Sequence, residues 1–308
     1  MTLAGGLAII AVNPEVQAAL SASRPIVALE STIIAHGLPY PENLSLAREL
    51  EGIVRAEGAT PATIALIGGR IRVGLDDAQF EILATSRDVA KVSRRDMAAV
   101  LASGRLGATT VAGTMIAARL AGIPVFATGG IGGVHRGAET SFDISADLDE
   151  LAQTQVLVVT AGAKAILDLP KTLEVLETRG VPVVGFGTDT FPAFWCRSSG
   201  LRLPLRLDSA EDVARAFDLH RRLGLPSGIV VANPIPEADA LDRDMIERAI
   251  AAALADADAA GISGKDVTPY LLKRIVDATS GASLRANLAL VRNNARLAAR
   301  IAMALTRL

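Results

Sequence analysis

Lys164 has the sequence surroundings of a nucleophilic lysine. It follows the apolar run VLVVT and the small residues Ala161-Gly162-Ala163, and it opens the apolar segment AILDL, which we expect to start a helix. The positive end of a helix and apolar surroundings both favour an uncharged amine. An uncharged lysine amine attacks a carbonyl carbon and forms a Schiff base. A lysine that simply extends to solvent is the alternative, and the position alone fits both.

Glu30 is a candidate for proton transfer. It ends the apolar run PIVALE, has no helical period around it, and is followed by Ser31-Thr32. Partial burial of a carboxyl group at the mouth of a strand favours its protonated form, which suits a general acid. Capping of the next segment is the alternative. His36 and His135 lie near the same predicted loops, and each could equally be a simple hydrogen-bonding residue.

The segment FDISADLDEL offers ligands for a metal ion. Asp143 and Asp147 are four residues apart, with Ser145 between them. Carboxylate oxygens suit hard divalent cations such as Mg²⁺ and Mn²⁺. The alternative is the start of a helix, where acidic residues face the positive end of the helix dipole. Asp149 and Glu150 fit that second interpretation well.

A glycine-rich loop, TGGIGGVHRG at 128–137, follows the apolar run IPVFA. It does not match the dinucleotide fingerprint G-x-G-x-x-G, because His135 stands where the third glycine should be if Gly130 is the first. It also lacks the lysine that a phosphate-binding Walker loop requires. Its backbone N–H groups could still hold an anion. A loop that is tight for packing reasons alone is the alternative.

Lys91 lies in the basic segment KVSRRD, together with Arg94 and Arg95. Three cations close together could form part of an anion-binding cluster. A solvated charged face is the simpler alternative. The sequence around these residues fits both.

Apolar runs and amphipathic segments alternate along the chain. Alternation of this kind predicts a three-layer α/β/α protein with a largely parallel or mixed central sheet, and no linker divides residues 1–308 into more than one domain. We expect strands in the runs 25–30, 62–67, 123–130, 156–162, 181–187 and 228–234. We expect helices at 43–57, 109–121, 171–179, 210–223 and 283–308. Ligands of open parallel sheets bind beyond the carboxyl ends of the strands, where Glu30, Lys164 and Asn233 would lie.

Composition excludes several classes of partner. The formal net charge is −2 and no long basic block occurs, so we expect no nucleic-acid binding. No apolar stretch reaches the roughly 20 residues of a membrane span, so we expect no membrane association. Cys196 is the single cysteine and cannot form an internal disulfide, which favours a reducing, cytoplasmic location.

Several long motifs together resemble one known family. They are VALESTIIAHGLPYP, KVSRRD, GATTVAGTM, FATGGIGGVHRGAETSFDISADL, AGAKAILDL and VVANPIPE. Their order and content resemble the pseudouridine-5′-phosphate glycosidases, which are grouped with the indigoidine synthase A proteins, from about residue 14 to residue 304. The resemblance implies reversible cleavage of the C–C glycosidic bond of pseudouridine 5′-phosphate into uracil and ribose 5-phosphate. It further implies a divalent metal, typically Mn²⁺, and a homotrimer.

The same resemblance implies roles for particular residues. Lys164 matches the nucleophilic lysine of the family, Glu30 its proton-transfer glutamate, and Asp143 its metal-ligand aspartate. Further matches are to residues that contact the substrate, namely Lys91, Val111, Ser145, Ala146, Asp147, His135 and Asn287. A C-glycoside has a carbon leaving group, so a lysine imine and a proton donor would make chemical sense of Lys164 and Glu30.

Three other functions compete with this interpretation. A Schiff-base aldolase or another sugar-phosphate lyase would use Lys164 in the same way without recognising uracil. A sugar-phosphate sensor would bind its ligand without turnover. A dinucleotide-dependent oxidoreductase is disfavoured by the mismatch in the glycine loop.

Overall fold

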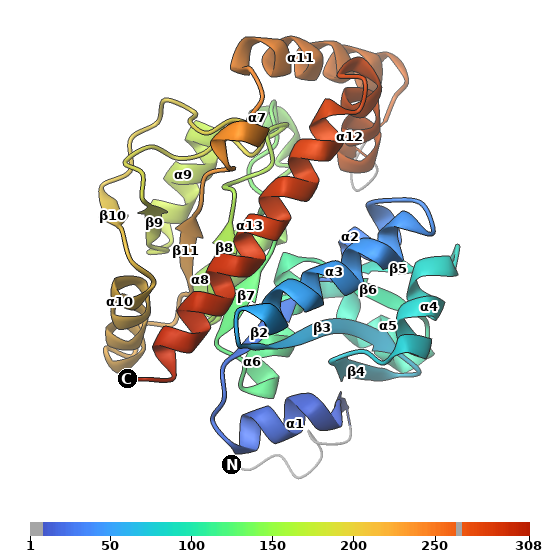
Figure 1. Ribbon diagram of the computed structural model, residues 1–308. Coiled ribbons are helices and arrows are strands. Elements are labelled where there is room, and N and C mark those ends of the chain that lie inside the picture. Colours follow the sequence, from blue (N-terminus) through green and yellow to red (C-terminus); the bar gives the residue numbers. More distant parts are fainter. Residues whose placement is uncertain (1–8, 263–266) are drawn as a thin grey trace.

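The chain folds around a large mixed sheet whose central strands are parallel. The computed structural model describes residues 9–262 and 267–308 (Figure 1). The main path of the sheet has the order β1-β4-β3-β2-β7-β8-β11-β9-β10, while β6 pairs with β3 and β5. The described strands are β1 (Ile10–Val12), β2 (Ile26–Leu29), β3 (Thr60–Ile67), β4 (Arg70–Val73), β5 (Ala90–Val92), β6 (Gly107–Thr109), β7 (Val125–Ala127), β8 (Leu157–Thr160), β9 (Val183–Phe186), β10 (Leu205–Leu207) and β11 (Ile229–Ala232).

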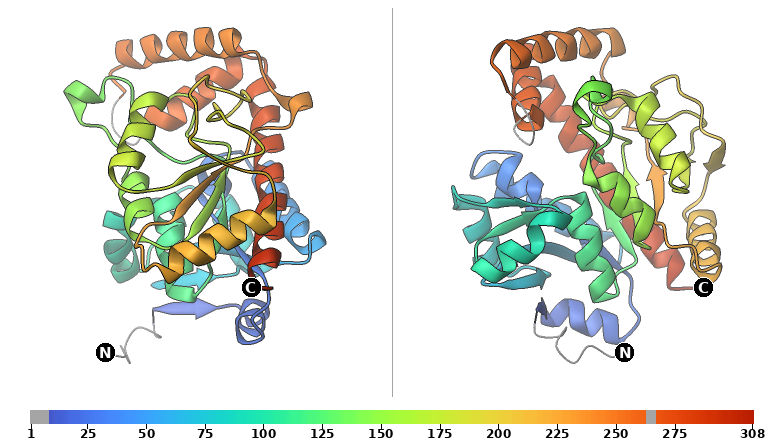
Figure 2. Two further views of the ribbon diagram at one scale, coloured as in Figure 1. Left: turned by 90° about the vertical axis from the view of Figure 1, so that its left-hand side faces the viewer. Right: turned by 180° about the vertical axis from the view of Figure 1, so that it is seen from behind.

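Helices cover both faces of this sheet and complete three layers. The long helix α13 (Ala282–Leu305) crosses one face beside α3 (Glu42–Ala56) and packs on β2, β7 and β8 (Figure 1). Helices α6 (Val111–Ala121) and α8 (Ala146–Gln153) cover the opposite face (Figure 2). The predicted three-layer α/β/α class with a largely parallel sheet is therefore confirmed.

The helices expected from the sequence are all present, with ends that differ by a few residues. They are α3, α6, α9 (Leu169–Thr178), α10 (Ala210–Arg222) and α13. The other described helices are α1 (Pro14–Ser21), α2 (Thr32–His36), α4 (Asp77–Thr85), α5 (Met97–Ser103), α7 (Ala138–Ser141), α11 (Arg243–Ala259) and α12 (Val267–Ala278), with 3₁₀ segments η2 (Arg94–Asp96) and η3 (Glu237–Asp239). Within the described ranges, no helix is long and apolar enough to cross a membrane.

The central strands read as unbroken apolar runs because both of their faces are covered. Every residue of β2, β8 and β11 is buried. Helix α13 lies close to them, and the buried residues of that helix include Ala286, Ala295, Ala298 and Ala302. Small side chains let a helix backbone approach a sheet closely, so the helix can bring polar side chains to the strand ends.

Two strands share one edge of β3 and meet head-on there. β2 pairs in parallel with residues 60–63, and β6 pairs antiparallel with residues 65–66 on the same edge, opposite β4. Their carboxyl ends therefore converge, and the Thr109 N–H donates to Ser31 Oγ at 2.8 Å. β5 runs parallel to β6 and ends at the same place. The sequence predicted neither β5 nor β6, and it predicted a single rim of parallel strands.

Candidate active site

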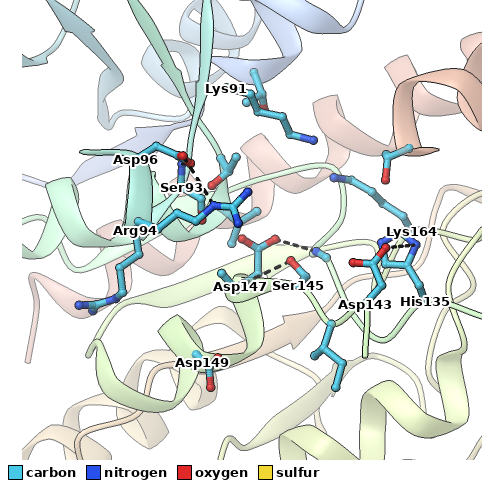
Figure 3. Close-up of a pocket in the computed structure, with 18 of the residues that line it drawn as sticks. Lys91, Ser93, Arg94, Asp96, His135, Asp143, Ser145, Asp147, Asp149 and Lys164 are labelled. Carbon is cyan, nitrogen blue, oxygen red and sulfur yellow. Dashed lines mark hydrogen bonds and ion pairs between the residues drawn. The ribbon is translucent and has the colours of Figure 1, made fainter. Parts of the chain in front are cut away.

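A cavity of about 480 Å³ opens where β2, β5 and β6 end and where the chain leaves β7 and β8. The residues to which the family resemblance gave a role line this cavity, with the exception of Asn287 (Figure 3). The residues concerned are Glu30, Lys91, Val111, His135, Asp143, Ser145, Ala146, Asp147 and Lys164. The converging strands thus bring together residues that are as much as 134 positions apart, the separation of Glu30 and Lys164.

Glu30 enters the cavity from the end of β2, and two hydroxyl groups hold its carboxylate. Thr32, at the start of α2, donates to Glu30 Oε2, and Thr128, just after β7, donates to Glu30 Oε1. Both oxygens of the carboxylate are therefore engaged, and its orientation is set. Glu30 is half-buried, which leaves it accessible from the cavity.

Lys164 lies in the loop between β8 and α9, and the expected position at a helix start is wrong. The helix begins five residues later, where Asp168 caps it and Pro170 occupies its first turn. The Lys164 N–H donates instead to Ile131 O of the glycine loop at 3.1 Å. In Figure 3 the side chains of Lys164 and Lys91 extend toward each other across the cavity.

His135, near the end of the glycine loop, lies beside Asp143. Its backbone N–H donates to Asp143 O at 3.0 Å, and its Nδ1 lies 3.8 Å from Asp143 Oδ2. Burial lowers the pKa of His135, Asp143 opposes that shift, and the charges of Lys164 and Lys91 lower the pKa further. A neutral imidazole that can both accept and donate a proton is the result.

Two helices begin at the cavity wall, and Asp147 ties their ends to the glycine loop. Thr110 caps α6 by accepting from the Gly113 N–H, and Ser145 caps α8 by accepting from the Asp147 N–H. Asp147 is buried; its Oδ1 accepts from the Ala112 N–H at 2.9 Å and its Oδ2 from the Gly132 N–H at 2.8 Å. The positive ends of two helices beside Lys91 make this wall suited to an anion.

The basic segment after β5 is anchored to α8 by a buried ion pair. Arg94 Nε and Nη2 donate to the two oxygens of Glu150 at 2.7 and 2.9 Å, and Glu150 is fully buried. Glu150 is therefore not a helix-start acid, as the sequence suggested, but the partner that holds Arg94. Asp149 is exposed and pairs with Arg179.

The glycines of the 128–137 loop serve close packing. A Cβ on Gly132 would lie 2.1 Å from Ser145 Oγ and 2.7 Å from Asp147 Oδ2. The loop amides are used inside the protein, since Ile131 N–H donates to Gly162 O and Val134 N–H to Thr172 Oγ1. The close contact at Gly132 supports the packing interpretation there, and the amides of Ile131 and Val134 already have partners within the protein.

Some residues behave differently from the sequence expectation. Asn287 lies on α13 beside Gly129, outside the cavity lining. His36 is also outside it, and burial together with Lys91 lowers the pKa of its imidazole. Thr32 and Thr128 lie within motifs that were singled out but were given no role of their own, because a threonine at a strand end carries no pattern that predicts its partner.

The donors available to a metal ion are few. Among the residues that the structure describes, no three His, Cys, Asp or Glu side chains gather as a metal-binding group. Asp143 presents its carboxylate to the cavity, whereas both oxygens of Asp147 are taken by backbone amides (Figure 3). One carboxylate in a polar cavity fits an ion that keeps most of its water ligands.

Comparison with known proteins places the chain in a family. A family model described as indigoidine synthase A like protein matches residues 15–304. A relative from Solibacter usitatus (strain Ellin6076) named pseudouridine-5′-phosphate glycosidase is 61% identical over 291 residues, 94% of this chain and 97% of the relative. A relative of the same name from Paracoccus denitrificans (strain Pd 1222) is 62% identical over 299 residues, 96% of this chain and 98% of the relative.

Two solved structures share the fold. The prealnumycin C-glycosynthase AlnA in complex with ribulose 5-phosphate has a TM-score of 0.91 and 43% identity, covering 97% of each chain. An indigoidine synthase A-like protein from Thermotoga maritima MSB8 has a TM-score of 0.86 and 38% identity, covering 92% of this chain and 94% of the other. The fold and the cavity are those of an α/β enzyme that acts on a small molecule. The chain belongs to the indigoidine synthase A-like family.

Gly132→Ala should damage the site, because the new methyl group would overlap Ser145 and Asp147. We expect a loss of about 1–3 kcal/mol in the free energy of unfolding from overpacking and a loss of activity of about 10²-fold from the displaced loop. Gly52→Ala on α3 is the matched control, since no atom lies within 4 Å of the position that its Cβ would take. Urea unfolding and turnover would measure both effects, and equal behaviour of the two variants would contradict the importance of close packing at Gly132.

Proposed function

We propose that this chain cleaves the C–C glycosidic bond of pseudouridine 5′-phosphate, giving uracil and ribose 5-phosphate, and that the reaction is reversible. The observation that carries the proposal is the arrangement of Lys164 and Glu30 in one cavity with an anion-binding wall. The names of the relatives at about 60% identity support the substrate. The ribulose 5-phosphate in complex with AlnA supports the sugar-phosphate part.

A carbon leaving group explains why a lysine and an acid are needed. Ordinary glycosidases use two carboxylates and release an oxygen leaving group through an oxocarbenium-like transition state. Uracil bound through C5 cannot leave in that way, because the pair of electrons must end on carbon. An amine on C1′ supplies electrons from the sugar side, and protonation of C5 accepts them on the base side.

The steps balance with the residues at hand. Lys164 Nζ bonds to C1′ as the C1′–O4′ bond breaks, and O4′ takes a proton from water, to which a proton is returned when the imine is hydrolysed. Glu30 accepts the proton that the Lys164 nitrogen then loses, and delivers a proton to C5 of uracil. The nitrogen lone pair forms C1′=N as the C1′–C5 bond breaks, and that bond's electrons restore the C5–C6 double bond. Water hydrolyses the imine, which frees Lys164 and ribose 5-phosphate.

The phosphate and the base would occupy different parts of the cavity. We assign the phosphate to the wall formed by Lys91 and the N-termini of α6 and α8. Backbone groups at Val111, Ser145, Ala146 and Asp147 would contact it, because the Asp147 carboxylate is already engaged. His135 would contact the sugar or the base. Asn287 would act from behind Gly129, since it does not line the cavity.

A divalent cation, for which we propose Mn²⁺, would be held by Asp143 together with water. Its charge would help to neutralise the substrate phosphate and to order water in the cavity. Asp143 faces the cavity, and its Oδ2 lies as far as 3.8 Å from His135 Nδ1, which leaves the carboxylate available to an ion and supports this assignment.

The family resemblance supports a proposal for the assembly, and the cysteine content supports one for the location. We propose a homotrimer, for which light scattering should return about three times the 31.9 kDa chain mass. The single cysteine, Cys196, is buried and supports a reducing, cytoplasmic setting.

The experiment that tests the function is incubation with pseudouridine 5′-phosphate and Mn²⁺, with free uracil detected by chromatography. An aldolase or another lyase that uses Lys164 would release no uracil from this substrate. A sensor would bind the nucleotide and leave it intact.

Lys164→Ala should abolish uracil release, because the proposed mechanism forms the imine on Lys164. Borohydride added to the unaltered enzyme with ribose 5-phosphate should leave a stable adduct on Lys164, located by peptide mass. Lys273→Ala, which removes an exposed lysine of α12, is the control and should behave normally. Near-normal uracil release by Lys164→Ala would show that the covalent mechanism is wrong.

Glu30→Gln should slow C–C cleavage far more than it weakens binding, since general acid–base steps contribute on the order of 10²–10⁴-fold. Glutamine keeps the shape of the side chain but cannot carry the proton. The variant should accumulate a covalent substrate adduct on Lys164, visible by mass spectrometry. Glu174→Gln on the exposed side of α9 is the control. Normal turnover by Glu30→Gln would assign the proton transfer to another group, with His135 the first candidate.

Chelation should abolish activity and Mn²⁺ should restore it. Asp143→Ala should raise the Mn²⁺ concentration needed for half-maximal activity by at least about tenfold, because a metal ligand is lost. Asp149→Ala is the matched control, since Asp149 is exposed and pairs with Arg179. Full activity after exhaustive chelation, with no metal found by elemental analysis, would rule out the metal.

A further inference from the structure

A row of buried polar groups connects the ends of β11 and β7, by way of α13, to Glu30. Asn233, just after β11, donates from Nδ2 to Asn294 Oδ1 at 2.9 Å. Asn294, on α13, donates from Nδ2 to Thr128 O at 2.8 Å. Thr128, just after β7, donates from its hydroxyl to Glu30 Oε1. The row therefore runs from the end of β11, which lies beyond β7 and β8 in the sheet, to the Glu30 carboxylate in the cavity.

The members of this row are deeply buried. Asn294 is fully buried, and Asn233 and Thr128 are 6% and 4% exposed. A buried hydrogen bond adds little net stability compared with an apolar pair of the same shape, while an unpaired buried amide is costly. Stability alone therefore does not explain two asparagines under the strand ends. Their geometric effect is to fix the backbone of Thr128 and so to aim its hydroxyl at Glu30.

Two threonine hydroxyl groups contact Glu30, one at each oxygen of its carboxylate. A carboxylate accepts from Thr128 and Thr32 at once, whereas a protonated carboxyl group must turn one oxygen into a donor and displace one of these hydrogen bonds. Hydrogen bonds to the charged form of an acid stabilise that form.

The other neighbours of Glu30 divide into two kinds. The titratable groups that line the same cavity are Lys91, Lys164, His135 and Asp143, together with Arg94, Arg95, Asp96, Asp147 and Asp149. From α3 and α13 the neighbours are apolar, and Leu50 and Val291 line a small cavity beside Glu30. Among the described residues, those of α3 and α13 that line this small cavity carry no charge, and the hydrogen-bonded link from α13 to Glu30 passes through Asn294 and Thr128.

We propose that Thr128 is a positioning residue that keeps Glu30 a carboxylate at the start of the cycle, and that Asn294 fixes Thr128 for this task. The inference rests on the proposed function, in which Glu30 first accepts the proton that the Lys164 nitrogen loses. A carboxylate that begins the cycle as an acceptor must later become the donor to C5. Each change of state requires one threonine hydroxyl to reorient, which a threonine can do without moving its backbone.

The test is the pH dependence of kcat/KM for uracil release. Activity that requires the Glu30 carboxylate is present above the pKa of that group and is lost as the pH falls through it. Thr128→Val keeps the shape of the side chain and removes one hydrogen bond to the charged form, so the acid limb should move upward by about 1–2 pH units. KM should change little. Thr128→Ser, which restores a hydroxyl, should bring the limb back.

Other variants separate positioning from structure. Asn294→Leu should move the acid limb in the same direction as Thr128→Val, although Asn294 touches neither Glu30 nor the cavity. Thr178→Val, on the exposed side of α9, should leave the profile unchanged. An unshifted acid limb in Thr128→Val, with a loss of rate that Thr128→Ser shares, would overturn the proposal.

A direct titration keeps this test independent of the proposed function. If the unaltered enzyme released no uracil, the reaction would be wrong, but the state of Glu30 could still be measured. The ¹³C signal of the Glu30 carboxyl, assigned by its absence in Glu30→Gln, should titrate at a higher pH in Thr128→Val than in the unaltered protein. Coincident titrations would overturn the proposal without reference to turnover.

Discussion

The site depends on a change of pairing partner along one edge of β3. β2 pairs with the first half of this edge, and β6 pairs with the second half from the opposite direction. Strands that run in opposite directions normally present their carboxyl ends at opposite edges of a sheet. Here β2 and β6 run toward each other along one neighbour, and the Thr109–Ser31 contact marks the point where they meet. Glu30 arrives from one direction, and Lys91 and Val111 arrive from the other. An acid and an anion-binding wall can therefore share one cavity without a long connecting loop.

The second half of the cavity is built from two loops that pair with each other. The glycine loop and the loop after β8 are joined by bridges between Ile131 and Ala163 and between His135 and Leu167. Lys164 is held in this ribbon through its backbone, so its side chain is left to extend into the cavity. Glycine is needed at position 132 because another chain segment lies where its side chain would be. Rigid backbone pairing, rather than flexibility, is the property that the loop supplies.

The sequence predicted the parts of this protein that have a strong local pattern. Buried parallel strands and amphipathic helices were recognised because their apolar residues recur with the period of the element. The three-residue strands β5 and β6 were missed, because three residues show no period and their role appears only through pairing with β3. Lys164 was found by its position after a strand, but its expected helix was not, since Pro170 and the cap Asp168 place the helix start further on. The partner of Glu150 could not be predicted, because Arg94 lies 56 residues away.

The charges in and around the cavity fall into two groups with different tasks. Arg94 and Glu150 satisfy each other, and Asp147 is satisfied by two backbone amides, so these charges fix the positions of η2, α6 and the glycine loop. Within the described residues, by contrast, no side chain is hydrogen-bonded to Lys164 Nζ, and Asp143 has only the distant imidazole of His135. A charge without a close partner is costly in a folded protein unless a ligand supplies one. Lys164 and Asp143, which the proposed reaction uses, are therefore available to a ligand, whereas Glu30 is already held by two hydroxyl groups.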